Sequence, residues 1–431
     1  MNTEQLYAIF CKSGVVCTDS RQISGNSLFF ALKGDNFDGN LYAASALEKG
    51  AAFSIVDNPE VAVSERFIVV DNVLTTLQQL AAFHRRSLAL PVIAITGTNG
   101  KTTTKELTAA ILGTQKKVEY TRGNLNNHIG VPLTLLSMTR ETEMGIVEMG
   151  ANHPGEIDFL CRIADPDFGI VTNLGKAHLE GFGGSEGVIR TKSELYRFLE
   201  AKNGTIFING DSRILNSAAG NRINKVCYGT SEDNWMRGTL IRKPPYLNLR
   251  AYFPQAATEI KSKLIGDYNF ENVLAALTIG RYFGIDPDKA VHAVESYEPS
   301  NNRSQLISSG TNTVIMDAYN ANPASMQASI ENFLGLDASQ KLLILGDMLE
   351  LGTESAREHQ KIVDLLANYP QLNVILVGSQ FSSTLKPGSF ISFTDSEKLK
   401  VYLSNHPVSD SLILVKGSHG IKLEKVISVI N

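Results

Sequence analysis

An apolar run followed by a glycine turn and a helical pattern is the feature that most constrains the fold of this chain. Residues 92–95 predict a buried strand, and residues 97–100 predict a tight turn. Helical spacing follows, with Leu107, Ala110 and Ile111 on one face. A strand, a glycine turn and a helix in this order direct backbone N–H groups and a helix N-terminus toward one point, which suits a phosphate group.

Two side chains directly after the turn agree with a nucleotide phosphate site. Lys101 supplies a point charge for the distal phosphates, and Thr102 supplies a hydroxyl where a magnesium ion would sit. The standard Walker pattern is not matched, because Ile95 replaces its first glycine, but the shorter G-x-x-G-K-T form is present. A turn that only joins strand to helix is the alternative. We interpret the stretch as an ATP site formed by Gly97, Thr98, Asn99, Gly100, Lys101, Thr102 and Thr103.

Length and composition predict a multidomain globular protein. The 431 residues suggest about three domains, and 43% apolar with 19% charged residues is typical of globular chains. The net charge of −4 indicates no polyanion-binding surface, so we expect no nucleic-acid partner. The N-terminus lacks a signal-peptide pattern, no apolar run is long enough to span a membrane, and the cysteines show neither zinc spacing nor a disulfide framework. We therefore expect a reduced, cytoplasmic protein without membrane insertion.

The order of predicted elements divides the chain into three α/β domains. Residues 1–88 predict a small N-terminal domain, and residues 89–298 alternate strands and helices, which is typical of a mostly parallel sheet covered on both faces. Residues 299–431 alternate again and predict a Rossmann-like domain. A helix capped by an Asp or Asn side chain is expected to begin within residues 266–272. The expected strands of the second and third domains are 92–95, 145–147, 168–171, 205–208, 313–316, 341–345, 373–377 and 412–415.

Polar side chains follow the expected central strands at their carboxyl ends, where doubly wound sheets bind ligands. Glu148 follows residues 145–147, and His178 lies in the segment after residues 168–171. Alone, His178 fits a satisfied structural histidine better than a ligand. Together with Glu148 and the phosphate loop at the same sheet edge, it favours a metal site. Magnesium accompanying ATP is the expected metal, because phosphate oxygens complete its octahedron.

Three further features have both a functional and a structural interpretation. Ser20 and Arg21 either bind a phosphate or form a solvated turn. The loop 120–132, with amide and imidazole side chains around glycines, either binds polar groups of a ligand or satisfies its own turns. Lys192 lies on a predicted helix and, from the residues alone, is a solvated helix charge.

Several separated motifs together resemble the Mur ligase family. They run through all three domains in order, which is far more specific than one phosphate loop. Within the family they are most similar to the member that adds D-alanyl-D-alanine to UDP-N-acetylmuramoyl-tripeptide in peptidoglycan synthesis, and the Asp-Asn-Pro-Arg motif of the diaminopimelate-adding members is absent. The motifs are Gly97-Thr-Asn-Gly-Lys-Thr-Thr-Thr-Lys-Glu106, Gly123-Asn-Leu-Asn-Asn-His-Ile-Gly-Val-Pro132, Glu148-Met-Gly-Ala-Asn152, Thr172-Asn-Leu-Gly-Lys-Ala-His-Leu-Glu180 and Tyr319-Asn-Ala-Asn-Pro323.

The resemblance implies a catalytic centre made of Lys101, Glu148, His178 and Lys192. Lys101 and the loop backbone would hold the ATP phosphates, and Thr102 and Glu148 would hold one magnesium ion. Glu148 would bridge to a second magnesium ion, held by His178 and by Lys192. The matching lysine is carbamoylated in many relatives, which turns a cation into an oxygen ligand and would overturn the solvated-charge interpretation of Lys192.

The resemblance also implies the remaining binding positions. Asn269 and Asn272 would lie near the adenine, Arg303 near the nucleotide, and Asp317 and Asn320 on the side that the third domain closes. The substrate-binding positions would be Ser20 and Arg21 for the uridine-diphosphate end, together with Asn127, Tyr319 and Asn322.

The implied activity is ATP-dependent amide ligation through an acyl phosphate, in a monomer that uses two magnesium ions and binds ATP, UDP-N-acetylmuramoyl-tripeptide and D-alanyl-D-alanine as small-molecule substrates. Two positions depart from the family. Asn40 stands where relatives usually have His, and Arg303 follows Ser-Asn-Asn rather than the common Gly. A sibling ligase, a folylpolyglutamate synthetase and a P-loop ATPase switch without ligation are the alternatives.

Overall fold

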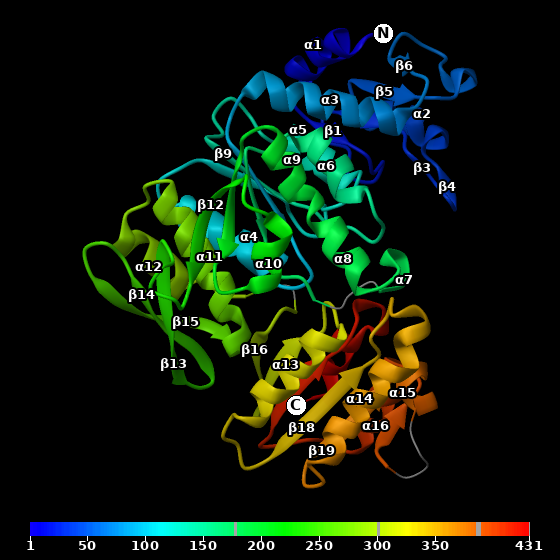
Figure 1. Ribbon diagram of the computed structural model, residues 1–431. Coiled ribbons are helices and arrows are strands. Elements are labelled where there is room, and N and C mark those ends of the chain that lie inside the picture. Colours follow the sequence, from blue (N-terminus) through cyan, green and yellow to red (C-terminus); the bar gives the residue numbers. More distant parts are fainter. Residues whose placement is uncertain (176–178, 300–301, 385–388, 431) are drawn as a thin grey trace.

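Three large β-sheets and one small ribbon organise the protein. The computed structural model describes residues 1–175, 179–299, 302–384 and 389–430. The sheets have four, nine and six strands and are formed by consecutive parts of the chain. In Figure 1 the N-terminal part (blue) lies at the top, the central part (cyan to green) in the middle and the C-terminal part (yellow to red) at the bottom. The predicted α/β class with three domains is confirmed.

The N-terminal sheet is parallel throughout and has the order β1-β2-β5-β6. Its middle strands are buried on both faces, because Leu28 and Phe30 face one core cluster while Phe29 faces another. Its elements are α1 (Thr3–Ser13), β1 (Val16–Cys17), β2 (Leu28–Phe30), the ribbon strands β3 (Lys33–Gly34) and β4 (Phe37–Asp38), the 3₁₀ turns Gly39–Tyr42 and Pro59–Val61, α2 (Ala43–Glu48), β5 (Phe53–Val56), β6 (Phe67–Val69) and α3 (Val73–Leu88).

The central sheet contains the phosphate loop and has the order β15-β14-β13-β12-β11-β10-β7-β9-β8. The four strands predicted here form at the predicted places, each within one residue at either end. The strands are β7 (Val92–Thr96), β8 (Val118–Tyr120), β9 (Met144–Glu148), β10 (Phe168–Val171), β11 (Thr205–Asn209), β12 (Asn224–Gly229), β13 (Met236–Lys243), β14 (Tyr246–Tyr252) and β15 (Ala257–Ile265).

The prediction that strands and helices alternate through the whole central domain is wrong for residues 236–265. There β13, β14 and β15 form an antiparallel meander at one edge of the sheet. In β14, Leu247, Leu249 and Ala251 are buried while Tyr246 and Arg250 are exposed. This period of two is typical of antiparallel strands with one covered face.

Helices cover both faces of the central sheet. Ile93 and Ile95 of β7 pack against α4, α11 and α12, whereas Val92 and Ala94 face the cluster that contains α3, α5, α6 and α9. Such alternation within one apolar run explains why a strand buried on both faces shows no polar side. The helices are α4 (Lys101–Leu112), α5 (Gly130–Leu136), α6 (Glu156–Ala164), α7 (Leu179–Phe182), α8 (Ser185–Lys192), α9 (Glu194–Ala201), α10 (Arg213–Ala219), the 3₁₀ turn Asp267–Asn269, α11 (Phe270–Tyr282) and α12 (Pro287–Ser296).

The third sheet has the order β16-β17-β21-β18-β19-β20 and is parallel except for its edge strand β16. All four strands predicted here are present, and two apolar clusters cover the two faces of the sheet. The elements are β16 (Gln305–Ser309), β17 (Asn312–Asp317), α13 (Pro323–Leu334), β18 (Lys341–Gly346), α14 (Ser355–Ala367), β19 (Asn373–Val377), α15 (Ser379–Thr384), β20 (Ile391–Phe393), α16 (Ser396–Asn405), β21 (Leu412–Lys416) and the 3₁₀ turns Gly352–Glu354, His419–Ile421 and Leu423–Val429.

The first two domains share packing, since one apolar cluster runs from Leu6 in α1 through α3 into the central sheet and reaches Ile223. Among the described helices, none combines the length and the apolar character that crossing a membrane requires.

Candidate functional site

The phosphate loop requires glycine at two positions. Gly97 and Gly100 have φ values of 140° and 77°, in the region that favours glycine. A Cβ at Gly97 would lie 2.1 Å from Thr172 Oγ1, and a Cβ at Gly100 would lie 2.3 Å from Asn272 Oδ1. The loop is therefore packed tightly between β10 and α11, and α4 begins at Lys101 directly behind it. This confirms the strand, turn and helix predicted from the sequence.

The Lys101 side chain donates hydrogen bonds to the backbone of its own loop. Its Nζ donates to the carbonyl oxygens of Gly97 and Thr98 at 2.8 and 3.1 Å. Removal from water lowers the pKa of the Lys101 ammonium, and nearby Glu148 partly opposes this shift. The lysine is thus held within the loop that would surround the phosphates.

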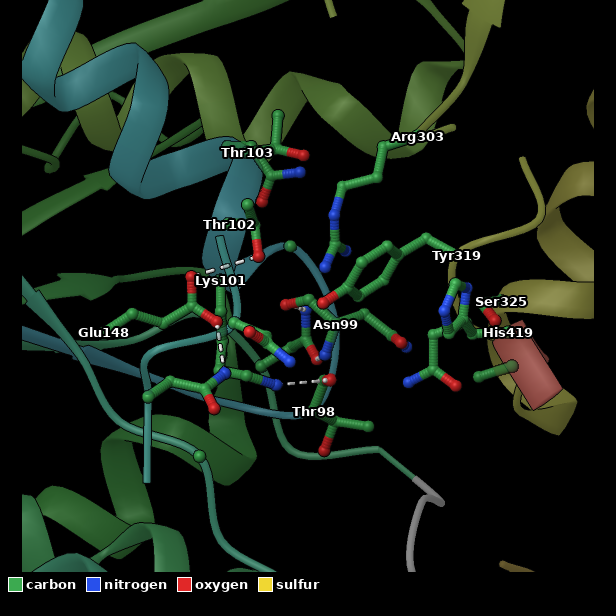
Figure 2. Close-up of a pocket in the computed structure, with 18 of the residues that line it drawn as sticks. Thr98, Asn99, Lys101, Thr102, Thr103, Glu148, Arg303, Tyr319, Ser325 and His419 are labelled. Carbon is green, nitrogen blue, oxygen red and sulfur yellow. Dashed lines mark hydrogen bonds between the residues drawn. The ribbon is translucent and has the colours of Figure 1, made fainter. Parts of the chain in front are cut away.

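Glu148 ends β9 and points at the first turn of α4. Its side chain is 2% exposed. Its Oε2 accepts a hydrogen bond from Thr102 Oγ1 at 3.0 Å, and its Oε1 accepts one from Asn126 Nδ2 at 2.9 Å. Figure 2 shows Glu148 and Thr102 facing each other beside Lys101. The structure thus brings together a carboxylate and a hydroxyl that the sequence placed 46 residues apart.

A pair of asparagines links the loop to the third domain. Asn322 precedes α13, and its Nδ2 donates to Asn99 Oδ1 at 2.6 Å. The same Asn322 side chain accepts from the backbone N–H of Ser325 at 2.9 Å and so caps α13. Asn99 is held from the other side by Asn173, whose Oδ1 accepts from the Asn99 backbone N–H at 2.9 Å. The phosphate loop and the N-terminus of α13 are therefore joined directly.

The third domain contributes a stacked wall opposite the loop. The Arg303 guanidinium lies 3.7 Å from the centre of the Tyr319 ring, and His419 stacks on Tyr319 with ring centres 5.8 Å apart. In Figure 2 Arg303, Tyr319 and His419 lie on the side of the cavity away from Glu148. In the same domain, the buried Lys416 Nζ donates to Asp317 Oδ2 at 2.6 Å. A cation, an aromatic ring and an imidazole thus line this side.

Asn269 and Asn272 lie where the loop meets α11, and both side chains are buried. The prediction that an Asp or Asn side chain caps this helix is wrong. Asn269 Nδ2 donates back to the Ile265 carbonyl at 2.9 Å, and Asn272 Nδ2 donates to Asn269 Oδ1 at 2.9 Å. Asn272 Oδ1 also accepts from Thr104 Oγ1 at 3.2 Å. These amides join α11 to α4 instead of capping the N-terminus of the helix.

One cavity of about 930 Å³ unites these groups between the central and third domains. Most of the predicted site residues line it: Thr98, Asn99, Gly100, Lys101, Thr102, Thr103, Asn127, Glu148, Asn269, Asn272, Arg303, Asp317, Tyr319 and Asn320. Gly97 and Asn322 are not part of the lining but contact it, through Lys101 and Asn99 respectively. Predicted residues from two domains thus converge on one space.

Comparison with known proteins agrees with this arrangement. Three family models match successive parts of the chain: the catalytic domain of the Mur ligase family at residues 14–85, the Mur ligase middle domain at 95–280 and the Mur ligase glutamate ligase domain at 302–419. A Bacillus subtilis (strain 168) protein named UDP-N-acetylmuramoyl-tripeptide–D-alanyl-D-alanine ligase is 34% identical over 96% of this chain and 92% of its own length. The chain belongs to the Mur ligase family.

Solved structures of Mur ligases have the same fold. MurF from Acinetobacter baumannii superposes with a TM-score of 0.86 and 31% identity, over 96% of this chain and 92% of that chain. MurF ligase from Thermotoga maritima in complex with ADP superposes with a TM-score of 0.84 and 26% identity, over 97% of each chain. The same ligase name belongs to an Escherichia coli (strain K12) relative that is 33% identical over 96% of this chain and 92% of its own length.

Besides Asn322, the predicted substrate residues Ser20 and Arg21 are not part of the cavity lining of this Mur ligase. The Arg21 guanidinium pairs with its neighbour Asp19, and these hydrogen bonds lower the pKa of Asp19 to about 2. Ser20 accepts from Lys49 Nζ at 2.9 Å through its carbonyl oxygen. Asn127 lines the cavity, yet its Oδ1 accepts from the backbone N–H groups of its own turn. The pair at residues 20 and 21 therefore belongs to a separate part of the N-terminal domain.

The interpretation of Lys192 as a solvated helix charge is wrong. Lys192 ends α8 with a side chain only 2% exposed, and its Nζ donates to the Ala151 carbonyl at 3.3 Å. Burial lowers the pKa of Lys192 to about 7. Helical periodicity could not find this, because α8 is short and polar and the burial comes from its neighbours. His178 lies outside the described residues.

Several cavity residues were not predicted individually. Asn126 holds Glu148, Lys416 holds Asp317, and His419 stacks on Tyr319. Each stands in a segment that the sequence marks as polar after a strand or around glycines. The sequence identifies these polar segments. It does not show which side chain of each segment points into the cavity, because that depends on three-dimensional packing.

Proposed function

We propose that this chain joins D-alanyl-D-alanine to UDP-N-acetylmuramoyl-tripeptide at the expense of ATP, in peptidoglycan precursor synthesis. The observation that carries the proposal is the single cavity in which the phosphate loop and Glu148 face Arg303 and Tyr319 of the third domain. Relatives with this ligase name, matched over nearly the whole chain, support the choice of substrates.

The nucleotide would lie along the loop with its phosphates at the N-terminus of α4. Backbone N–H groups of residues 97–103 and the Lys101 ammonium suit the phosphates. Asn269 and Asn272 lie where the adenine is expected, and Arg303, Asp317 and Asn320 meet the nucleotide from the third domain. Lys101 would exchange its bonds to the loop carbonyls for bonds to phosphate oxygens. The ADP complex of the Thermotoga maritima neighbour supports this use of the site.

The oxygen donors at the end of β9 fit a magnesium ion. Thr102 Oγ1 and Glu148 Oε2 lie 3.0 Å apart, and magnesium prefers oxygen ligands completed by phosphates and water. Within the described ranges, no three His, Cys, Asp or Glu side chains gather into a protein-only metal site. A bound ion would offset the repulsion between the phosphates and an approaching carboxylate. We assign it to Thr102 and Glu148, and a second ion to Glu148, His178 and Lys192.

Lys192 becomes an oxygen ligand only after carbamoylation. A neutral amine adds to carbon dioxide, forming an N–C bond and releasing a proton. With a pKa of about 7, the buried Lys192 offers a large neutral fraction at neutral pH. The Ala151 carbonyl that now holds its Nζ lies near the cavity, since Ala151 itself is part of the lining.

The reaction has two steps. The tripeptide carboxylate attacks the γ-phosphorus, the bond to ADP breaks, and an acyl phosphate forms. The amine of D-alanyl-D-alanine then attacks the acyl carbon, the bond to phosphate breaks, and the amine loses a proton. Lys101 and the loop N–H groups stabilise charge on the transferred phosphoryl group. Contact between Asn99 and Asn322 brings the third domain over the loop, which excludes water from the acyl phosphate.

We also propose roles for the predicted substrate residues, the assembly state and location of the enzyme, and its domain boundaries. Ser20 and Arg21 hold the uridine-diphosphate end, whereas Asn127, Tyr319 and Asn322 contact the reacting substrates. The enzyme acts as a cytoplasmic monomer, with domain boundaries after residues 88 and 298.

Phosphate release from Mg-ATP tests the proposal. D-alanyl-D-alanine is held constant while the acceptor is either UDP-N-acetylmuramoyl-tripeptide or its dipeptide precursor. Release with the tripeptide, accompanied by a ligated product seen by mass spectrometry, is the expected result. Release only with the dipeptide and a different amine would assign the chain to a sibling ligase. Release without any acceptor would favour an ATPase switch.

A further inference from the structure

A second lysine of α4 lies against the proposed metal carboxylate. Lys105 follows Lys101 by one helical turn, and its side chain is fully buried. Its Nζ lies 3.6 Å from Glu148 Oε2 and 3.7 Å from Glu106 Oε1. No hydrogen-bond partner reaches this nitrogen from the part of the chain that the structure describes. Lys105 is therefore a buried cation that lies at ion-pair distance from two carboxylates without a hydrogen bond to either of them.

Both carboxylates are oriented by other groups. Glu148 is held by Thr102 and Asn126, and Glu106 Oε2 accepts from the Tyr297 hydroxyl at 2.8 Å. The geometry of Glu148 thus does not depend on a bond from Lys105. What Lys105 supplies to this buried site is charge, and a buried carboxylate without a counter-charge is costly.

We infer that Lys105 is the built-in counter-ion of Glu148, which neutralises the carboxylate in the metal-free protein and so weakens its binding of a free divalent cation. The inference rests on the proposed magnesium site. An ammonium beside a carboxylate repels any cation that approaches the same carboxylate. Nucleotide phosphates add negative charge that outweighs this repulsion. Lys105 therefore makes metal binding depend on the nucleotide, so that the ion enters together with ATP.

Two substitutions on neighbouring positions test the sign of this effect. Lys105→Met keeps the length of the side chain and removes its charge, whereas Glu106→Gln removes a negative charge and leaves Lys105 in place. The probe is Mn²⁺, titrated into nucleotide-free protein and followed by electron paramagnetic resonance. The Mn²⁺ affinity of Lys105→Met should be at least about tenfold higher than that of the unaltered protein. Glu106→Gln should bind it more weakly. With ADP present, the difference between Lys105→Met and the unaltered protein should shrink.

Thermal unfolding separates this role from simple packing. If Lys105 acts as a counter-ion, Lys105→Met should lower the melting temperature of the metal-free protein. Mn²⁺ should then restore most of this decrease in melting temperature. A packing role predicts an equal loss with and without Mn²⁺, and that result would overturn the inference.

Unchanged or weaker Mn²⁺ binding by Lys105→Met would also overturn it. If Lys105→Met does not fold, Glu106→Gln decides alone, because equal or tighter Mn²⁺ binding there contradicts the counter-ion role. Failure of the unaltered protein to bind Mn²⁺ even with ADP would instead remove the proposed magnesium site itself.

Discussion

Replacement of Gly100 by alanine tests whether the phosphate loop and the asparagines of α11 form one packed unit. Gly100 has a φ of 77°, and an added Cβ would lie 2.3 Å from Asn272 Oδ1 and 2.9 Å from its Cγ. The left-handed backbone alone costs an L-residue about 1–2 kcal/mol. Because contacts under 3.0 Å essentially never occur, the Asn272 side chain must also move.

The displacement of Asn272 adds a second cost. It breaks the bond from Thr104 Oγ1 at 3.2 Å and the bond to Asn269 Oδ1 at 2.9 Å. Each buried hydrogen bond contributes about 1 kcal/mol net. The free energy of unfolding should therefore fall by about 3–4 kcal/mol in total. ADP affinity should fall as well, since Asn269 and Asn272 are the residues proposed to lie at the adenine.

Gly155→Ala is the matched control. Gly155 also precedes a helix of the central domain with a φ of 87°, but an added Cβ would meet nothing within 4 Å. Only the backbone cost of about 1–2 kcal/mol should appear, with ADP affinity kept. Urea unfolding followed through Trp235, the single tryptophan of the chain, gives the stability, and calorimetry gives the ADP affinity. Equal losses in the two variants, or unchanged ADP affinity in Gly100→Ala, would refute the reasoning.

Three further substitutions test other parts of the site. Glu148→Gln keeps the shape of the side chain but removes its charge. Magnesium-dependent turnover should therefore fall by about a hundredfold or more, whereas ADP binding without metal should persist. Unchanged turnover would exclude Glu148 as a magnesium ligand. Loss of the remote helix cap in Asn72→Ala should cost about 1 kcal/mol in stability. Asn322→Ala loses a cap and also the bond to Asn99, so it should cost about 2 kcal/mol, and it alone should lower kcat/KM. In buffer free of carbon dioxide, the native state keeps Lys192 less protonated than the unfolded chain between pH 7 and its ordinary pKa of about 10.4. The free energy of unfolding should therefore rise with pH across this window, and a Lys192→Met variant with the same rise would contradict the assignment.

The parts of the fold that the sequence predicted are those where one physical signal dominates. The run at residues 92–95 is apolar at every position because β7 is buried on both faces, and no other element of that length fits such a run before a glycine turn. The loop was predictable for a similar reason, since Gly97 and Gly100 have backbone conformations that other residues rarely adopt.

The parts that sequence reasoning missed depend on neighbours that are distant along the chain. The antiparallel strands β14 and β15 alternate buried residues with exposed or half-buried ones, but the predicted alternation of strands and helices left this period of two unrecognised. The expected Asp or Asn cap of this helix did not form, because the Asn269 side chain donates to the Ile265 carbonyl and accepts from Asn272 instead. In both places the local structure was determined by tertiary contacts and not by the local sequence preference.

Lys105 and Lys192, both buried in the central domain, show how the surroundings of one residue type can favour two different roles. Lys105 lies between Glu106 and Glu148, whose charges stabilise an ammonium ion, so it serves as a fixed cation. Lys192 is buried with a carbonyl oxygen as its hydrogen-bond partner, and burial outweighs the attraction of the more distant Glu156 and Glu194. A neutral amine is able to react with carbon dioxide, and the product is an anion. Under the two proposals above, Lys105 repels a cation that approaches Glu148, and carbamoylated Lys192 supplies a ligand to it. The balance between the two lysines would then set when the ion binds.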